Sequence, residues 1–404
     1  MAQNLPILVV GGGIGGLTAA IALGRSGRRV KLIERAERFE PIGYGIQLGP
    51  NAFHVFDQLG IASDVLRQAS LPEEGQLRDA ITGDLIARLP MSDEIKRRYG
   101  NPYAVIHRGD LHEVLLDACD RVKTVDLENS CELKIFDDNG SKVTARTVTD
   151  RQIDAAALIA ADGVWSRIRT QMFQDEPPQQ FGYVAMRCLR PIEEFPRELA
   201  PNAVILWTGS RYHMIHYPLR GGKLFNVVVG FRLQAPGSDT PADPAQQMFS
   251  LFANACPEVR ALLKYIDTSR YWDIVAFNPI PEWTKGRVAL IGDAAHAMLQ
   301  AMAQGACQAI EDSLTIAACI DENGEDYEAA FRKYHSGRLL RATRVQYMSR
   351  YMWEAIHVYG AMRNLRNDMF ARMSSTDVLE SLQWLYSRPV GVADRDAYCL
   401  SFAA

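Results

Sequence analysis

The fold is decided at the start of the chain by Pro6-Ile7-Leu8-Val9-Val10-Gly11-Gly12-Gly13-Ile14-Gly15-Gly16-Leu17-Thr18-Ala19-Ala20. The apolar, β-branched run over residues 6–10 predicts a buried parallel strand, and the residues after Gly16 favour a helix. Between them, Gly11, Gly13 and Gly16 fit the pattern GxGxxG. Such glycines let the backbone turn tightly and bring the amides of a helix N-terminus close to a pyrophosphate. This stretch therefore predicts the first half of a dinucleotide-binding unit.

A second strand and an acidic residue complete that unit. Residues 29–33 predict a strand that ends at Glu34. A carboxylate about 20 residues after the glycines accepts hydrogen bonds from an adenosine ribose. The residues expected to contact the dinucleotide here are Gly11, Gly13, Ile14, Gly15, Gly16, Glu34 and Arg35. The pattern by itself does not distinguish NAD from FAD.

Length and composition place the chain among ordinary globular proteins. Its 404 residues predict two or three domains at roughly 150 residues per domain. The fractions of hydrophobic and charged residues, 48% and 23%, predict a folded chain with a substantial core. Lys and Arg number 44 against 48 Asp and Glu, a net charge of −4 that gives no support to a nucleic-acid partner.

The sequence also gives no sign of a membrane, disulfide or metal site. No apolar run approaches the roughly 20 residues of a transmembrane helix, and residues 1–6 do not resemble a signal peptide. The seven cysteines are scattered and form no CxxC pair, which predicts reduced thiols. Eight histidines without an HExxH motif do not support a metal site. We therefore expect a cytoplasmic protein.

Two later segments identify the dinucleotide. Asp162-Gly163-Val164-Trp165-Ser166-Arg167-Ile168-Arg169 follows an apolar strand over residues 155–161 and is similar to a DGxxSxxR box. Gly292-Asp293-Ala294-Ala295-His296 follows a strand over residues 288–291 and is similar to a GDAAH box. Alone, the first aspartate would indicate a turn and the second a helix N-cap. In this order, the motifs resemble those of the single-component FAD-dependent aromatic hydroxylases, the class A flavoprotein monooxygenases.

The resemblance assigns further residues to FAD. It implies that Asp293 contacts the ribityl and pyrophosphate region, and that Gln304-Gly305-Ala306-Cys307 runs beside the isoalloxazine at a helix N-terminus. It also matches Arg108 with an arginine that contacts the pyrophosphate. The remaining cofactor-binding residues implied in this way are Gln47, Arg108, Asp162, Asp293, Gly305 and Ala306.

The fold class expected is α/β. A discontinuous, Rossmann-like FAD-binding domain would cover residues 1–70, 101–176 and 273–325. A substrate-binding β domain would be inserted as residues 71–100 and 177–272, followed by a helical C-terminal region over residues 326–404. The inserted part contains short β-branched or aromatic runs that predict an antiparallel sheet, at residues 183–189, 203–208, 213–217 and 224–230.

One of these strands supplies the expected substrate side. His213 and Tyr217 are four residues apart and so share one face of a strand, while His216 faces the other way. Taken alone, both side chains would be ordinary packing residues. The segment is similar to the corresponding strand of the 3-hydroxybenzoate 6-hydroxylases, where this His and Tyr lie in the substrate pocket. The catalytic residues that the resemblance implies are His213, Gln300, Tyr217 and Tyr103.

Several positions depart from the family or carry a second interpretation. Ala297 stands where relatives usually have Pro, and Ala301 where para-hydroxylating relatives commonly have an aromatic, so the pocket beside the flavin is expected to differ. Asp79 is expected to serve a turn, with a place near the substrate pocket as the alternative. The arginines spaced by three, Arg338, Arg341 and Arg344, predict a solvated helix face, with NADH docking or a subunit interface as the alternative.

The resemblance implies an FAD-dependent monooxygenase. NADH or NADPH would reduce the flavin, O2 would form a C4a-hydroperoxide, and oxygen would pass to a phenolic aromatic acid. His213 would deprotonate the phenol, Gln300 would orient the para carbon, and Tyr103 and Tyr217 would bind a carboxylate or hydroxyl. The preferred substrate is 3-hydroxybenzoate, giving gentisate; salicylate and 6-hydroxynicotinate are the alternatives.

Two alternatives come from other classes, a non-oxygenating FAD-dependent dehydrogenase and a flavin-binding sensor. By family, a homodimer is also expected. Only one dinucleotide fingerprint is present, so the nicotinamide is expected to bind transiently.

Overall fold

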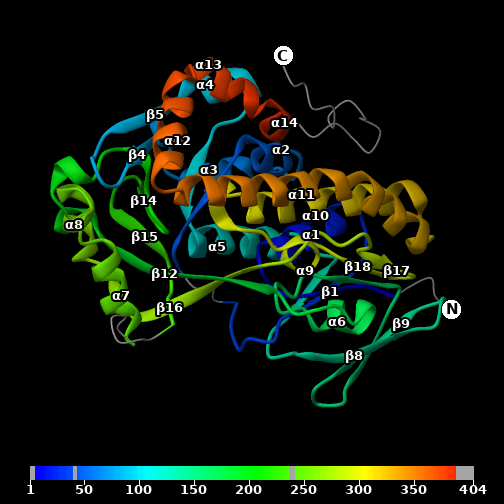
Figure 1. The fold of residues 1–404 in the computed structure, drawn as a ribbon. Coiled ribbons are helices and arrows are strands. Elements are labelled where there is room, and N and C mark those ends of the chain that lie inside the picture. Colours follow the sequence, from blue (N-terminus) through cyan, green and yellow to red (C-terminus); the bar gives the residue numbers. More distant parts are fainter. Residues whose placement is uncertain (1–4, 40–42, 236–241, 388–404) are drawn as a thin grey trace.

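Two large sheets and a group of long helices make up the protein (Figure 1). This computed structural model describes residues 5–39, 43–235 and 242–387. The six described cysteines are free thiols, and Cys399 lies outside the described residues. Within those ranges, none of the helices combines the length and the apolar character that a bilayer crossing requires.

The first sheet carries the glycine motif. Its strand order is β17-β18-β11-β1-β2-β7, and all neighbours are parallel except β17 and β18. The strand at the centre, β1, is buried at every position because sheet neighbours flank it and helices cover it. The strands are β1 (Ile7–Val10), β2 (Val30–Ile33), β7 (Val125–Glu128), β11 (Ala157–Ala160), β17 (Thr284–Lys285) and β18 (Val288–Leu290).

Helices pack on this sheet and on each other. The helix that follows β1 directly, α1, contacts both α5 and α10. The expected strand–turn–helix–strand unit is thus confirmed. The helices of this part are α1 (Ile14–Arg25), α2 (Pro50–Gln58), α3 (Ala62–Gln68), α5 (Arg108–Asp120), α6 (Arg167–Phe173), α9 (Asp293–His296) and α10 (Gly305–Asn323).

Two small antiparallel sheets complete the part of the chain that carries the glycine motif. One pairs β3 (Gly45–Leu48) with β6 (Ala104–His107). The other has the order β10-β9-β8, formed by β8 (Leu133–Asp138), β9 (Val143–Thr147) and β10 (Gln152–Ala155).

The second large sheet has seven strands in the order β16-β12-β15-β14-β13-β4-β5. Its members come from two separate stretches of the chain, so the discontinuous fold is confirmed. The expectation of an antiparallel sheet is wrong at one place, because β4 pairs with β13 in parallel. The strands are β4 (Glu74–Asp79), β5 (Leu85–Pro90), β12 (Gln179–Pro191), β13 (Ala203–Gly209), β14 (Tyr212–Leu219), β15 (Leu224–Arg232) and β16 (Asp267–Ala276).

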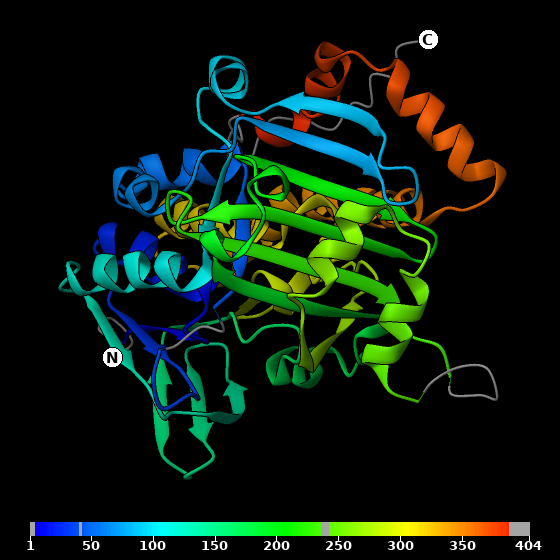
Figure 2. The same cartoon turned by 90° about the vertical axis from the view of Figure 1, so that its left-hand side faces the viewer.

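This sheet is covered on both faces. Figure 2 shows α7 and α8 in front of it and the long helix α11 behind it, on the side of the FAD-binding part. The remaining elements are α4 (Asp93–Tyr99), α7 (Pro244–Leu251), α8 (Pro257–Leu263), α11 (Tyr327–His357), α12 (Ala361–Arg372), α13 (Ser375–Ser381), α14 (Gln383–Tyr386), η1 (Ile192–Glu194), η2 (Arg197–Leu199) and η3 (Gln300–Met302).

The arginines of α11 correct one expectation. Arg338 and Arg341 face α10 instead of solvent and are only 3% and 8% exposed. A spacing of three puts both on one side of the helix, where Glu311 and Asp312 of α10 neutralise them. Arg344 lies over the ring of Trp384, 3.9 Å from its centroid. The expected solvated face is therefore wrong, because an acidic pair distant in sequence makes this face part of the interior.

Asp79 at the end of β4 does more than serve a turn. Its Oδ1 accepts hydrogen bonds from the amides of Ile81 and Thr82, as a turn residue would. Its two oxygens also accept from Arg363 and Asn367 of α12. These contacts lower the pKa of Asp79, although its burial acts in the opposite direction. The turn also anchors α12.

Candidate functional site

The glycine turn is held tightly between neighbouring backbones. Gly11 has φ +110°, a conformation that favours glycine, and a Cβ there would collide with the carbonyl of Ala161. A Cβ on Gly16 would collide with the Gly11 carbonyl oxygen. Because Asp162 follows Ala161 directly, this packing places the DGxxSxxR box beside the glycine turn.

Glu34 closes the turn from the end of β2. Its Oε2 accepts a hydrogen bond of 2.7 Å from the Gly12 amide, and its Oε1 accepts one of 2.9 Å from the Ala36 amide. The carboxylate thus fixes the loop, and lone pairs remain for a ribose hydroxyl. Arg35 beside it is exposed. Contact of either residue with a ribose stays a prediction.

The start of α1 is suited to an anion. Gly13 is the N-cap, with no side-chain cap and no acidic residue in the first turn. Around a Cβ placed on Gly13, the described residues leave open space to 4 Å. The amides after Gly13, including those of Ile14 and Gly15, carry the positive end of the helix dipole. A pyrophosphate fits this cradle.

Two aspartates flank the cradle. Asp162 Oδ1 is buried without a hydrogen-bond partner in the described structure, and desolvation raises the pKa of this carboxyl. Asp293 is exposed at the start of α9, yet protein surrounds it closely enough that desolvation raises its pKa, an effect reduced by the charges of His296 and Arg108. Two carboxyls poised in this way can accept hydrogen bonds from hydroxyls of a bound ligand.

The N-terminus of α10 lies next to Asp293. A Cβ on Gly305 would lie 3.8 Å from Asp293 Oδ1, so the N-terminus of α10 adjoins the GDAAH box. Ala306 packs against the main core cluster. Arg108 is exposed at the start of α5, and its amide donates to the Tyr44 carbonyl. The motifs therefore lie beside one another, as FAD binding requires, while individual contacts with FAD stay predictions.

Arg169 links the DGxxSxxR box to the GDAAH box, a role that the sequence did not indicate. It is 2% exposed, pairs with Asp175 and donates to the carbonyls of Ala294 and Ala295. The ring of Phe277 stacks on it at 3.4 Å. The last residue of the DGxxSxxR box thus positions the GDAAH box.

Three of the expected residues form one hydrogen-bonded group. The Tyr103 hydroxyl donates to Gln47 Oε1 at 2.6 Å, and Gln47 also interacts with the Tyr217 hydroxyl. Burial raises the pKa values of Tyr103 and Tyr217, so both stay protonated at neutral pH. The group lies against Cys307 of α10, whose Sγ is 3.9 Å from the Gln47 carbonyl oxygen. It therefore connects the second large sheet to the FAD cleft.

His213 lies on the same strand as Tyr217 but has different partners. It is 3% exposed, its ring covers Gly230, and its Nδ1 is 2.9 Å from Nε2 of His357 on α11. Burial and the neighbouring His357 lower the pKa of His213 well below its usual range, so its imidazole is neutral. His216 is on the opposite face, as expected, where it accepts a hydrogen bond from Trp207 Nε1.

Ile215 lies between His213 and Tyr217 on this strand face, and it packs against both adjoining apolar clusters. One of these clusters includes Leu299 and Ala301, so the segment before α10 faces this strand. Gln300 is exposed at the start of η3, and no contact joins it to His213 in the described residues. The carbonyl of Ala297 accepts hydrogen bonds from the Phe277 amide and from Gln346. The wall of the expected pocket is thus apolar in its middle and polar at each end.

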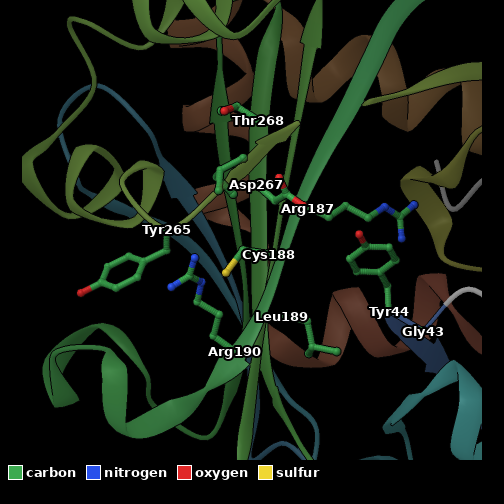
Figure 3. Close-up of a pocket in the computed structure, with 10 residues that line it drawn as sticks. Gly43, Tyr44, Arg187, Cys188, Leu189, Arg190, Tyr265, Asp267 and Thr268 are labelled. Atoms are coloured by element: carbon green, nitrogen blue, oxygen red, sulfur yellow. The ribbon is translucent and has the colours of Figure 1, made fainter. Parts of the chain in front are cut away.

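The structure adds one cation that the sequence did not single out. Figure 3 shows the guanidinium of Arg187 beside the ring of Tyr44, on the other side of β12 from Cys188, at a cavity of about 620 Å³. The Tyr44 and Trp272 rings lie 5.1 and 5.5 Å from it. Its Nε is buried without a partner within the described ranges, and burial lowers its pKa. Nothing in the local sequence distinguishes it from a surface arginine.

A buried polar network behind the cleft was also missed. Asn51 donates to both Gln304 and Glu311, and His296 contacts Asp312 at 2.6 Å. Burial would raise the pKa of each acid, but nearby positive groups lower both to about 2, chiefly Arg341 for Glu311 and His296 for Asp312. The only sequence signal was the position of Asn51 and His296 inside quoted motifs. This network fixes α10 against α2 and α9.

Comparison with known proteins agrees with this geometry. The FAD binding domain family matches residues 4–349. The chain is 41% identical over 393 residues to 3-hydroxybenzoate 6-hydroxylase of Polaromonas naphthalenivorans (strain CJ2), covering 96% of this chain and 97% of the relative. The chain belongs to the FAD-dependent aromatic hydroxylases.

Two more members of the family are similar over most of their length. A 6-hydroxynicotinate 3-monooxygenase of Bordetella bronchiseptica (strain ATCC BAA-588 / NCTC 13252 / RB50) is 33% identical over 347 residues, covering 85% of this chain and 90% of the relative. A salicylate hydroxylase substrate complex has a TM-score of 0.77 at 25% identity, covering 96% of each chain. The expected fold class and family are therefore confirmed. Like other members, this aromatic hydroxylase is a monooxygenase that uses FAD and NAD(P)H.

Proposed function

We propose that this aromatic hydroxylase adds a hydroxyl group to 3-hydroxybenzoate, at the carbon para to the existing hydroxyl, and releases gentisate. The observation that carries the hydroxylation of a phenolic acid is the shared strand face, on which a neutral His213 and a protonated Tyr217 lie on either side of an apolar residue. The relative named 3-hydroxybenzoate 6-hydroxylase supports the same substrate, because it aligns over 96% of this chain.

Individual side chains have separate roles in the proposed hydroxylation. FAD would be held at the start of α1 near Asp162 and Asp293, and when bound it would supply the oxygen-activating chemistry, with NADH or NADPH as the reductant and O2 as the oxygen source. His213 takes the proton of the phenol, which increases electron density at the ring carbons ortho and para to it. Gln300 orients the para carbon, and Ile215 with Leu299 keeps water from the ring.

The acid group of the substrate is held at the other end. Tyr103 and Tyr217 have raised pKa values, so both stay protonated. Tyr217 can donate its hydroxyl proton to a carboxylate, while Tyr103, whose proton goes to Gln47 Oε1, holds the Gln47 amide beside Tyr217. Arg187 interacts electrostatically with Tyr217 and supplies the positive charge. A charge-assisted hydrogen bond of this kind contributes roughly 1.5–3 kcal/mol.

The direct test is a panel of hydroxylated aromatic acids. The FAD-loaded enzyme is mixed with NADH or NADPH and each acid in oxygen-18 gas, and the product is identified by chromatography and mass spectrometry. We expect gentisate carrying one heavy oxygen from 3-hydroxybenzoate, in near-stoichiometric ratio to the nicotinamide consumed. Catechol from salicylate, or a hydroxylated pyridine from 6-hydroxynicotinate, as the main coupled product would contradict the proposed substrate.

Salicylate and 6-hydroxynicotinate are the second candidates, because the chain resembles a salicylate hydroxylase in structure and a 6-hydroxynicotinate 3-monooxygenase in sequence. The strand face does not separate them, since each substrate is an aromatic acid with a ring hydroxyl. Reaction without heavy oxygen in the product would favour a dehydrogenase instead.

We also propose a cytoplasmic homodimer. The support for a dimer is a group of exposed apolar side chains along and beside α11 and α12 that a second copy would cover: Tyr347, Tyr351, Tyr359, Met362, Leu365 and Met369. The location is supported by the requirement for NAD(P)H, an intracellular reductant. Separately from the dimer, we retain as a proposal the domain boundaries expected from the sequence. Light scattering on the purified enzyme should give twice the chain mass, and a mass of one chain would contradict the dimer.

A further inference from the structure

A second histidine contacts the expected base. His357, the last residue of α11, is 6% exposed and 144 positions away from His213 in sequence. Its Nε2 is 2.9 Å from Nδ1 of His213, and its own Nδ1 is 2.7 Å from the carbonyl oxygen of Trp353. The pair therefore forms a short chain that runs from a main-chain carbonyl to His213.

The direction of this chain follows from the atoms at its end. A carbonyl oxygen only accepts, so Nδ1 of His357 carries the proton and donates to Trp353. In the neutral imidazole, Nε2 of His357 then holds a lone pair and accepts from Nδ1 of His213. Nδ1 of His213 must carry its own proton, which leaves the lone pair on Nε2. That nitrogen has no hydrogen-bond partner among the residues that the structure describes.

Both rings are held in place by their surroundings. The ring of Trp353 lies 5.3 Å from His213 and 4.7 Å from His357, edge to face in each case. The Tyr183 ring lies 4.7 Å from that of His357, tilted by 39°. These contacts restrict rotation of both imidazoles, so the protonation pattern is fixed by the fold. Burial lowers the pKa of His357 to about 4, which keeps it neutral and able to accept.

We propose that His357 is a positioning residue that holds His213 in the tautomer with a proton on Nδ1 and a free lone pair on Nε2. The inference rests on the proposed function, in which His213 deprotonates a phenol. The phenol O–H bond breaks, its proton passes to Nε2, and the electron pair stays on the phenolate oxygen. The imidazolium so formed donates through Nδ1 to His357, and the proton returns to the product before release.

A packing role for the pair predicts something different. If His357 only filled space, replacing it with an apolar residue of similar size would change stability and leave proton transfer unaltered. If it sets the tautomer, an acceptor must stand at this position. His357→Gln keeps an oxygen that can accept from Nδ1 of His213, whereas His357→Leu removes it.

The test compares the two variants in the FAD-loaded enzyme, with melting temperature and bound flavin as checks on folding. We expect His357→Leu to lower the rate of coupled hydroxylation by about tenfold or more, within the roughly 10²–10⁴-fold that a general base supplies. His357→Gln should stay within about threefold of the wild type. Flavin reduction and the KM for substrate should change little in either. Equal rates in the two variants would overturn the proposal.

Two further measurements separate this inference from the proposed function. In a His213→Ala background, His357→Leu should have no additional effect on coupling, because it acts through His213. A normal ratio of product to NADH in His213→Ala itself would refute the base, and with it the proposed function. A loss of coupling in His213→Ala, but not in His357→Leu, would refute only the role of His357.

A more acidic substrate and nitrogen-15 NMR of His213 test the same proposal in two further ways. A ring-fluorinated 3-hydroxybenzoate, whose phenol ionises more readily, should narrow the difference between His357→Leu and the wild type. Nitrogen-15 NMR of the labelled wild type should show Nδ1 of His213 protonated and Nε2 not; the reverse pattern would overturn the proposal. His216→Gln is the matched control, since His216 is equally buried but faces away, and it should leave coupling unchanged.

Discussion

At the scale of single residues, two glycines of one motif have different tasks. Gly16 is enclosed by protein, since a Cβ there would collide with the Gly11 carbonyl oxygen. Gly13 has an ordinary extended backbone, with φ −77° and ψ −176°, and a Cβ there would point into open space. Gly16 is therefore needed for the fold, whereas at Gly13 we expect the requirement to come from the ligand.

This difference predicts opposite effects of the same substitution. Gly13→Ala should leave the unfolding free energy of the apoprotein within about 0.5 kcal/mol of the wild type, yet raise the Kd for FAD about tenfold or more, because a methyl group then occupies the pyrophosphate cradle. Gly16→Ala should destabilise the apoprotein by about 1–3 kcal/mol, since it overpacks the turn. Urea denaturation and flavin titration measure both. Equal loss of stability in the two variants would contradict the assignment.

Arg187 leads to a prediction about substrate charge. Because its guanidinium has no carboxylate partner among the described residues, an incoming acid can supply one. Arg187→Met should raise the Kd for 3-hydroxybenzoate by about tenfold or more, while the Kd for the uncharged 3-hydroxybenzamide should change less than twofold. Perturbation of the flavin spectrum reports both. Arg332→Met is the control, since Arg332 is exposed, pairs with Glu328 and lies outside this cavity. An equal loss of affinity for the acid and the amide in Arg187→Met would refute the charge argument.

At the scale of elements, α12 is held to the second sheet through one carboxylate. Asp79 is fully buried and accepts from Arg363 and Asn367, while much of the outer face of α12 is exposed. A helix with so few buried side chains depends on its polar anchor more than a core helix does.

Removing the anchor should therefore release the helix. Asp79→Ala leaves Arg363 unpaired and should lower the unfolding free energy by about 3–5 kcal/mol, with faster proteolytic cleavage within α12. Asp84→Ala, an exposed change in the same turn, should stay within about 0.5 kcal/mol. Comparable proteolysis of the two variants would show that α12 is held by other contacts.

At the scale of the whole molecule, the buried ions between α10 and α11 make stability depend on pH. The pKa of Glu311 falls from its usual 4.5 to about 2 and that of Asp312 from 3.8 to about 2. A depressed folded-state pKa means that the unfolded chain binds protons first as the pH falls. The contribution of these groups is thus complete above about pH 4.5 and is lost as the pH approaches 2.

We expect the unfolding free energy to fall between pH 5 and pH 3, with a slope that is shallower in Glu311→Gln than in the wild type. Each carboxylate can account for on the order of 3 kcal/mol over the full range. Urea midpoints at several pH values measure the slope. An unchanged slope in Glu311→Gln would mean that other carboxylates dominate acid unfolding.

Local patterns in the sequence predicted much of this fold. The strand before the glycines, the helix after them and the four runs of the second sheet all lie where their apolar patterns indicate, because neighbouring residues produce these signals. The parallel pairing of β4 with β13 was not predictable, since strand direction depends on how distant segments meet.

The candidate site shows the same limit. Motifs indicated Asp162, Asp293 and the strand of His213; Asp162 lies beside the glycine turn, Asp293 lies beside the N-terminus of α10, and the strand reaches α10 through Tyr217 and Gln47. The contact of His213 with His357 and the pairing of Arg338 with Glu311 join residues 144 and 27 positions apart, so no local pattern reveals them. Arg338 was assigned to solvent because a regular spacing of arginines looks the same on an exposed face and opposite a buried acid.

The length of α11 has a practical consequence for engineering. With 31 residues and about 1.5 Å per residue, the helix extends about 46 Å, and it carries both an arginine that pairs with the acids of α10 and, at its end, the ring that touches His213. A chimaera that exchanged only the seven-stranded sheet for that of another hydroxylase would place the other enzyme's base, at the position of His213, against α11 of this chain. Grafts intended to change specificity should therefore transfer sheet and helix as one unit.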